Sequence, residues 1–149
     1  MKLLRDILYR VGLEEVFGAT NIAITSVAFD SRKVEKHSLF VALSGTEVDG
    51  HDYISLAIEA GAIAIVCERV PETAVEKVTY IKVNNSKTAL GFIAANFYNN
   101  PSQELKLIGV TGTNGKTTVA TLLYELFQNL DKKSGLLSTV KIKIGKEEH

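Results

Sequence analysis

The sequence is short of cysteine, of net charge and of long apolar runs, and each shortage removes a class of protein. A single cysteine, Cys67, among 149 residues excludes an internal disulfide. Acidic and basic residues are equal in number, 17 of each, so no electrostatic argument favours nucleic acid or an anionic membrane as a partner. The longest apolar run, 62–67, is too short to cross a bilayer.

A zinc-binding pattern and a secretion signal are also missing from the sequence. The three histidines, His37, His51 and His149, lack ligand spacing, and we expect His51 to shape its loop rather than to transfer protons. An acid and a base within Met1–Asp6 interrupt what would be the apolar part of a signal. We therefore expect a cytoplasmic protein without membrane insertion. A hydrophobic content of 46% is enough for a globular core.

Short apolar runs alternate with helical patterns through the first hundred residues, which is typical of an α/β domain with a mainly parallel sheet. Leu39–Leu43 is almost wholly apolar and predicts a strand buried on both faces. Further strands are expected over 24–29, 62–67 and 78–83. Helices are expected over 3–11, between Asp52 as N-cap and Gly61 as C-terminal stop, and from Ser86 as N-cap to about Phe97.

The break at Asn99–Gln103 predicts a boundary between a complete domain, 1–104, and the beginning of a second one, 105–149. In the second part, 138–144 reads as a strand and Gly145-Lys146 as the turn of a hairpin, with too few residues after it for a returning strand. We therefore expect this chain to be the N-terminal part of a longer protein.

A glycine-rich loop, Gly112–Thr118, lies between an apolar run and a helical pattern. Leu105–Thr111 before it is of buried-strand type, and apolar residues recur at a helical period after it. In a strand, loop and helix of this kind, backbone N–H groups and the positive helix end hold polyphosphate oxygens. Lys116 would add charge, and the hydroxyl of Thr117 would ligate magnesium. The alternative is an ordinary glycine turn before a helix.

A second candidate site lies in the first domain, where Asp30-Ser31-Arg32 and Ser44–His51 each follow a predicted strand. Ligands of α/β sheets gather at the carboxyl ends of strands. A serine hydroxyl and backbone amides there could hold a diphosphate or a base edge, with Arg32 adding charge. Ordinary turn chemistry, with Arg32 as a solvated ion-pair partner, explains the same residues.

The string T-G-T-N-G-K-T-T at 111–118 departs from the general phosphate-loop pattern, because Val110 stands where that pattern has its first glycine. Its shorter spacing resembles the Mur ligase and folylpolyglutamate synthetase superfamily, which forms amide bonds through an acyl phosphate. A folylpolyglutamate-type ligase fits less well, since its loop lies near the start of the chain. Asp30-Ser31-Arg32, the run 39–43 and Asp49-Gly50-His51 resemble the N-terminal domain of Mur ligases.

The approach F-Y-N-N-P-S at 97–102 most resembles the MurE branch, which adds the third amino acid, diaminopimelate or lysine, to UDP-N-acetylmuramoyl-L-alanyl-D-glutamate in peptidoglycan synthesis. The MurF branch shares the D-S/T-R and D-G-H strings but usually has serine where Thr113 stands. The resemblance implies a small uridine-nucleotide-binding α/β domain followed by the truncated start of a P-loop ATPase domain. The sequence does not distinguish diaminopimelate from lysine, and it leaves the oligomeric state open.

The resemblance also implies residue roles. Ser31 and the backbone near Phe29, with Thr46, Glu47 and Val48, would hold the uridine nucleotide. ATP would lie on the loop, with Lys116 on the β- and γ-phosphates as the catalytic residue and Thr117 on Mg²⁺. The loop residues are Gly112, Thr113, Asn114, Gly115, Lys116, Thr117 and Thr118.

The remaining metal, peptide and amino-acid sites of the family would lie beyond His149, so we expect the chain alone to be inactive. A non-catalytic uridine-nucleotide-binding module with an idle loop is the alternative from another functional class. The intact Lys116-Thr117 pair favours the enzyme, because an idle loop has no chemical need for either residue.

Overall fold

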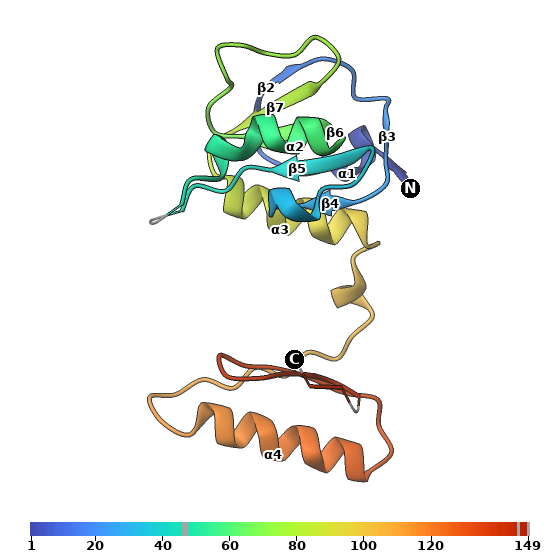
Figure 1. Ribbon diagram of the computed structural model, residues 1–149. Coiled ribbons are helices and arrows are strands. Elements are labelled where there is room, and N and C mark those ends of the chain that lie inside the picture. The colour runs from blue at the N-terminus through green and yellow to red at the C-terminus, as the bar shows by residue number, and fades with distance from the viewer. Residues whose placement is uncertain (46–47, 146, 149) are drawn as a thin grey trace. The chain divides into compact units, whose positions relative to one another are not determined.

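The structure, a computed structural model, describes residues 1–45, 48–145 and 147–148. The chain divides into two compact units, Met1–Leu105 and Lys106–His149 (Figure 1). None of the helices in these described stretches combines the length and the apolar content that crossing a bilayer requires.

The first unit is built on a five-stranded sheet of order β2-β7-β6-β5-β4, in which only β2 runs antiparallel to its neighbour. This confirms the predicted α/β class with a mainly parallel sheet. A separate antiparallel pair, β1 (Lys2–Leu3) with β3 (Ala23–Ile24), lies outside it. The strands of the main sheet are β2 (Leu13–Phe17), β4 (Val27–Ala28), β5 (Ser38–Val41), β6 (Ala62–Cys67) and β7 (Thr79–Val83).

Helices cover both faces of this sheet (Figure 1). The short α1 (Leu4–Ile7) and the long α3 (Ser86–Phe97) pack on one face, and α2 (Ile54–Ala60) packs on the other. Because strand side chains alternate between faces, Leu39 and Val41 of β5 join the first core while Phe40 joins the second. The prediction that this strand is buried on both faces is confirmed for β5. The described residues of this unit also form three 3₁₀ turns: η1 (Ser31–Lys33), η2 (Gly50–Tyr53) and η3 (Pro101–Gln103).

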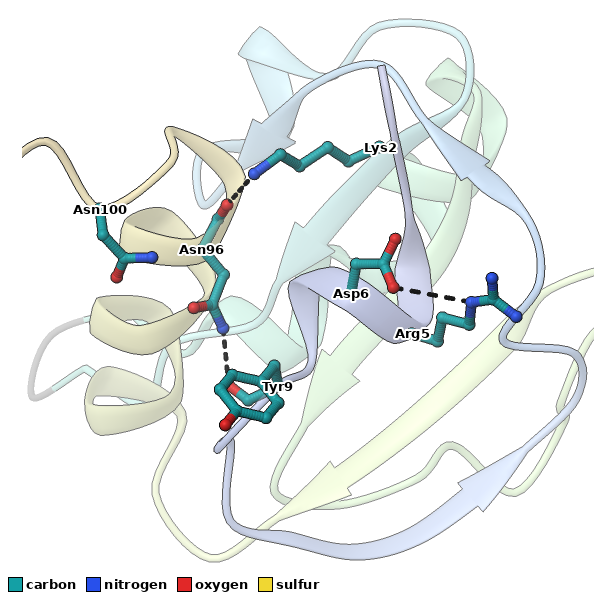
Figure 2. A pocket seen from close by; sticks show the side chains of 6 residues that line it. All are labelled: Lys2, Arg5, Asp6, Tyr9, Asn96 and Asn100. Atoms are coloured by element: carbon teal, nitrogen blue, oxygen red, sulfur yellow. Dashed lines mark hydrogen bonds and ion pairs between the residues drawn. The ribbon is translucent and has the colours of Figure 1, made fainter.

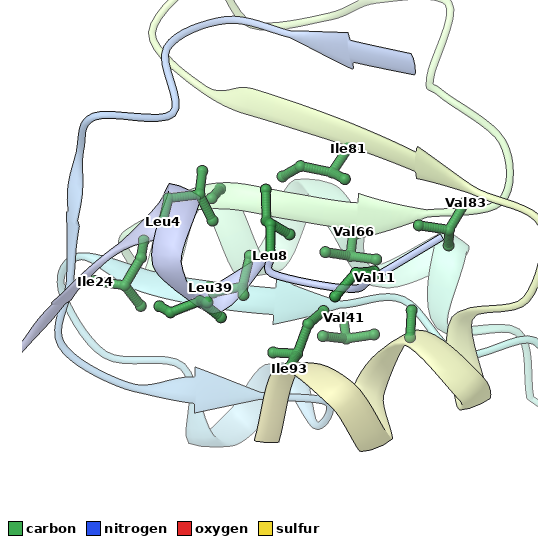
Figure 3. Packing of buried hydrophobic residues seen from close by; sticks show 13 residues of the cluster. Leu4, Leu8, Val11, Ile24, Leu39, Val41, Val66, Ile81, Val83 and Ile93 are labelled. Atoms are coloured by element: carbon green, nitrogen blue, oxygen red, sulfur yellow. The ribbon is translucent and has the colours of Figure 1, made fainter. Parts of the chain in front are cut away.

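Figure 3 shows the core on the α1 and α3 face, where apolar side chains from both helices meet the sheet. Leu4, Ile24, Leu39, Val66 and Ile93 are fully buried there. The packing explains why Leu8 and Val11 are buried with Leu4 and Ile7 even though only Leu4–Ile7 is helical.

Two predicted elements of the first unit are shorter than expected. The helix over 3–11 is limited to four residues, because Lys2 and Leu3 pair with β3 and Arg10 takes a positive φ of 60°. The strand over 24–29 is divided, because Ile24 pairs with β1 whereas Val27 and Ala28 pair with β5. The chain changes sheets between the two pieces.

The helix caps also differ from the prediction, except at Gly61. Asp49 rather than Asp52 accepts a backbone hydrogen bond, from His51, because the η2 turn comes before α2 and includes Asp52. Asn85 rather than Ser86 caps α3, accepting from the Thr88 N–H at 2.8 Å. Gly61 ends α2 in the left-handed region, at φ 113°.

The second unit consists of α4 (Lys116–Asn129) and an antiparallel sheet of order β10-β9-β8. Its small core includes Tyr124 of α4 and Leu136 of β8. The predicted helix after the glycine loop is confirmed. The strands are β8 (Gly135–Leu137), β9 (Ile142–Ile144) and β10 (Glu147–Glu148).

Two strand predictions in this region are wrong. Leu105–Thr111 is irregular, with Leu107 and Ile108 exposed, since no strand of the described residues pairs with it and a strand needs a hydrogen-bonded neighbour. The strand predicted over 138–144 begins only at Ile142, because Ser138 closes a turn with Lys141. A returning strand does exist: β10 pairs with β9, Glu147 opposite Ile144.

Candidate functional site

Four parallel strands of the first unit end at one edge of the sheet, here called the carboxyl edge. The segments that leave it are Asp30–Lys33 after β4, Ser44–Asp49 after β5, Glu68-Arg69 after β6 and Asn84–Ser86 after β7. Because β4 and β5 are neighbours in parallel register, the Asp30 and Ser44 segments leave adjacent strands. Ligand sites of open parallel sheets lie at this edge.

The Asp30-Ser31-Arg32 segment forms the η1 turn directly after β4. The Asp30 carboxylate accepts from the Arg32 N–H at 3.1 Å and, in a forked ion pair, from Nε at 2.9 Å and Nη2 at 2.8 Å. These bonds lower the pKa of Asp30 to about 2. The Arg32 side chain is 86% exposed and paired with Asp30, as the alternative of a solvated ion-pair partner predicts.

Ser31 and Phe29 remain available for a ligand in this turn. The hydroxyl of half-buried Ser31 has no hydrogen-bond partner among the residues that the structure describes. Phe29 is 60% exposed although it is large and apolar, and on the neighbouring segment Val48 is 58% exposed. Thr46 and Glu47, the other two predicted uridine contacts, lie outside the described residues. The edge thus offers a free hydroxyl beside exposed apolar surface.

Gly50 lets the chain return closely against the end of β5. Its N–H donates to the Leu43 carbonyl at 2.8 Å, and a Cβ at this position would lie 2.6 Å from Leu43 N. No side chain fits such an approach without backbone movement. The central glycine of the D-G-H string is therefore required by packing.

His51 of the same string has a structural role. Its Nε2 accepts from the Glu68 N–H at 2.9 Å, so its Nδ1 carries the ring proton and donates to Asp49 at 2.6 Å. The side chain is only 7% exposed. The backbone and ring hydrogen bonds from His51 lower the pKa of Asp49. Both ring nitrogens are occupied, which agrees with the expectation that His51 shapes its loop.

Glu68 was not singled out from the sequence, yet it joins three segments of the carboxyl edge. Its Oε1 accepts from the N–H and the hydroxyl of Ser86, both at 2.8 Å, and its Oε2 accepts from the Ser44 hydroxyl at 2.7 Å. The Ser86 backbone bond, followed by the Ser44 bond, lowers the pKa of Glu68. One signal in the sequence could have identified Glu68: it is an acidic residue directly after a buried strand, at the edge of the sheet that carries the site.

A hollow of about 350 Å³ lies at the other end of α3 and is bridged by hydrogen bonds (Figure 2). The Lys2 ammonium donates to the Asn96 carbonyl, and the Asn96 amide donates to the carbonyls of Ile7 at 2.9 Å and Tyr9 at 2.6 Å. These bonds join the N-terminal segment to α3. Its lining is Lys2, Arg5, Asp6, Tyr9, Asn96 and Asn100.

In the second unit, the predicted phosphate loop leads directly into α4. Gly112 and Gly115 take positive φ values of 147° and 76°, and no side chain caps the helix. The Lys116 ammonium donates to the Gly112 carbonyl at 2.6 Å and the Thr113 carbonyl at 3.3 Å, so it lies over its own loop. Thr113, Asn114 and Thr118 are exposed, and Thr117 is half-buried.

This arrangement fits an anionic polyphosphate, because an uncapped helix N-terminus, two glycines in left-handed geometry and an ammonium group meet in one loop. For a magnesium ion, the group of this loop that could serve as a ligand is the hydroxyl of Thr117. Within the described part of the chain, no group of three His, Cys, Asp or Glu residues could complete a metal site.

Comparison with known proteins matches the two units separately. A model of the Mur ligase family, catalytic domain, matches residues 23–98, and a model of the Mur ligase middle domain matches residues 110–149. The first match contains the carboxyl edge, and the second contains the phosphate loop.

Relatives at high identity carry one function in their names. The chain is 53% identical over 139 residues to the UDP-N-acetylmuramoyl-L-alanyl-D-glutamate–2,6-diaminopimelate ligase of Cytophaga hutchinsonii, covering 93% of this chain and 29% of that protein. It is 43% identical over 145 residues to the enzyme of the same name in Clostridioides difficile, covering 97% and 30%. The chain thus spans less than a third of the length of these relatives.

Solved structures show the same fold. A structure of a UDP-N-acetylmuramoyl-L-alanyl-D-glutamate–2,6-diaminopimelate ligase aligns with a TM-score of 0.72 at 21% identity, over 98% of this chain and 29% of that one. The MurF ligase of Thermotoga maritima in complex with ADP aligns with a TM-score of 0.55 at 33% identity, over 70% and 23%. With its two units each matched by a Mur ligase model, the chain belongs to the Mur ligase family.

Proposed function

We propose that the chain is the N-terminal part of an ATP-dependent ligase that adds 2,6-diaminopimelate to UDP-N-acetylmuramoyl-L-alanyl-D-glutamate in cytoplasmic peptidoglycan synthesis. The observation that carries this proposal is the identity of 53% over 93% of the chain to a ligase of that name. Because the chain covers 29% of that relative, the activity belongs to a protein of the relative's length.

The carboxyl edge of the first unit is proposed to bind the uridine nucleotide of the substrate. Ser31 would donate its hydroxyl, which no described residue engages, and Phe29 and Val48 would offer apolar surface to the ligand. Thr46 and Glu47 would contribute from the same loop. The pairing of Arg32 with Asp30 supports a role for this arginine in fixing the turn that presents Ser31.

The loop Gly112–Thr118 is proposed to hold ATP. Backbone N–H groups at the start of α4 and the Lys116 ammonium would hold the phosphates, and Thr117 would contribute one ligand to Mg²⁺. Lys116 would exchange its contacts with the loop carbonyls for phosphate oxygens. Bound ATP would supply the phosphoryl group that activates the D-glutamate carboxylate as an acyl phosphate. The chain's own contribution is to position phosphates and to balance their charge.

A ligation assay with three acceptors tests this proposal against its alternatives. The protein, extended to the length of its relatives, should join diaminopimelate to the UDP-linked dipeptide and release ADP. Ligation of D-alanyl-D-alanine to a UDP-linked tripeptide would favour the MurF branch instead. Binding of uridine nucleotide without any ligation would favour the non-catalytic module, and lysine in place of diaminopimelate would correct only the amino acid.

A further inference from the structure

The loop between Ser44 and Asp49 is attached at both of its ends to one dipeptide, Glu68-Arg69. At the start of the loop, the Ser44 hydroxyl donates to Glu68 Oε2 at 2.7 Å. At its end, Asp49 accepts from the Arg69 guanidinium, and His51 accepts from the Glu68 N–H at 2.9 Å. The two residues that follow β6 therefore hold Ser44 and Asp49, the first and last residues of this segment after β5.

Glu68 is itself held firmly. Its other oxygen, Oε1, accepts two hydrogen bonds from Ser86 at the first position of α3, where the positive helix end favours a carboxylate. Cys67, the residue before it, is the fully buried end of β6. Both oxygens of Glu68 are thus occupied by protein donors, so this carboxylate can affect a ligand through the loop rather than by contact.

We propose that Glu68 is a positioning residue for the uridine nucleotide: its carboxylate holds Ser44, and its N–H holds His51 and with it Asp49, on either side of the exposed Val48. The inference rests on the uridine-binding function proposed for the carboxyl edge. Attachment points that are fixed before the ligand arrives leave less of the chain to be ordered on binding, and this gain appears as affinity. No contact between Glu68 and the nucleotide is required.

The test measures the affinity of the 149-residue chain for uridine diphosphate by calorimetry. Glu68→Ala should weaken Kd about tenfold, since ordering one or two released side chains again on binding costs about that much affinity. Glu68→Gln should recover most of the loss, because its amide can still accept from Ser86 and can donate to the Ser44 oxygen. Glu76→Ala, at an exposed glutamate outside this network, is the matched control and should leave Kd unchanged.

A double-mutant comparison separates positioning from general stability. Ser44→Ala removes only the bond at the start of the loop, so combined with Glu68→Ala it should weaken Kd no further than Glu68→Ala alone. If the losses of affinity in the two single variants multiply in the double variant, the positioning role is overturned and the uridine assignment stands. The same holds if the folded variants keep the wild-type Kd. Lack of uridine diphosphate binding by the wild-type chain would overturn the uridine assignment and the positioning role together. Should Glu68→Ala fail to fold, Ser44→Ala and Glu68→Gln provide the same comparison.

Discussion

Replacing Gly50 with alanine should destabilise the first unit, although alanine adds only one methyl group. The new Cβ would lie 2.6 Å from Leu43 N and 2.9 Å from Leu43 O, and neither backbone atom can turn away as a flexible side chain could. Relief requires the η2 turn to move from the end of β5. That movement stretches the 2.8 Å bond from Gly50 N–H to the Leu43 carbonyl.

The expected loss follows from three contributions. Forced overpacking costs about 1–3 kcal/mol, and a weakened hydrogen bond between these half-buried residues costs about 1 kcal/mol. The stiffer unfolded chain returns about 0.5–1 kcal/mol. The net loss is about 2 kcal/mol, which should lower the urea midpoint by on the order of 1 M.

Thiol labelling of Cys67 during urea unfolding measures this loss in the first unit alone, because Cys67 is the single cysteine and lies fully buried there. Gly91→Ala is the matched control. Gly91 is exposed within α3, and an added Cβ would meet no described atom within 4 Å beyond its chain neighbours and the backbone of its own helix, so the substitution should stabilise by roughly 0.5–1 kcal/mol. If the urea midpoint shifts in the same direction in Gly50→Ala and Gly91→Ala, the argument from the close approach at Gly50 is refuted.

Three other predictions concern single groups. Because Arg32 lowers the pKa of Asp30 from 3.8 to about 2, the stability from this pair should be complete above about pH 4 and lost as pH falls toward 2; Arg32→Ala should return the NMR titration midpoint of Asp30 toward 3.8. Burial raises the pKa of Cys67 to about 11, so its thiol should resist labelling at pH 8 until the chain unfolds, and fast labelling of folded protein would contradict its core position. In the extended ligase, Lys116→Ala should lower kcat/KM about a hundredfold or more while uridine diphosphate affinity stays unchanged, and equal loss of both would contradict separate nucleotide sites.

Continuous apolar runs were the most dependable signal for the fold. The strand predicted over 62–67 is β6 itself, and those over 39–43 and 78–83 overlap β5 and β7, since buried parallel strands need apolar side chains on both faces. Gly61 was equally clear, because the left-handed geometry that ends α2 favours glycine.

Predictions failed where the outcome depends on a distant partner or on a choice between adjacent polar residues. Leu105–Thr111 has the composition of a strand but lacks a neighbour to pair with among the described residues. Asn85 and Ser86 are both good caps by composition, but the hydroxyl of Ser86 bonds to Glu68 while Asn85 accepts from the Thr88 N–H. For the same reason the sequence did not single out Glu68, whose partners Ser44 and Ser86 are distant in the chain.

The most direct measurement for the proposed function follows oxygen from substrate to phosphate. The extended protein would receive UDP-N-acetylmuramoyl-L-alanyl-D-glutamate with ¹⁸O in the reacting D-glutamate carboxylate, together with diaminopimelate and magnesium-ATP. In the proposed reaction a carboxylate oxygen bonds to the γ-phosphorus, and attack by the amine breaks the bond from carbon to that oxygen. Each phosphate released should therefore carry one ¹⁸O by mass spectrometry, with one amide product and one ADP. Unlabelled phosphate, or label in AMP, would contradict the account.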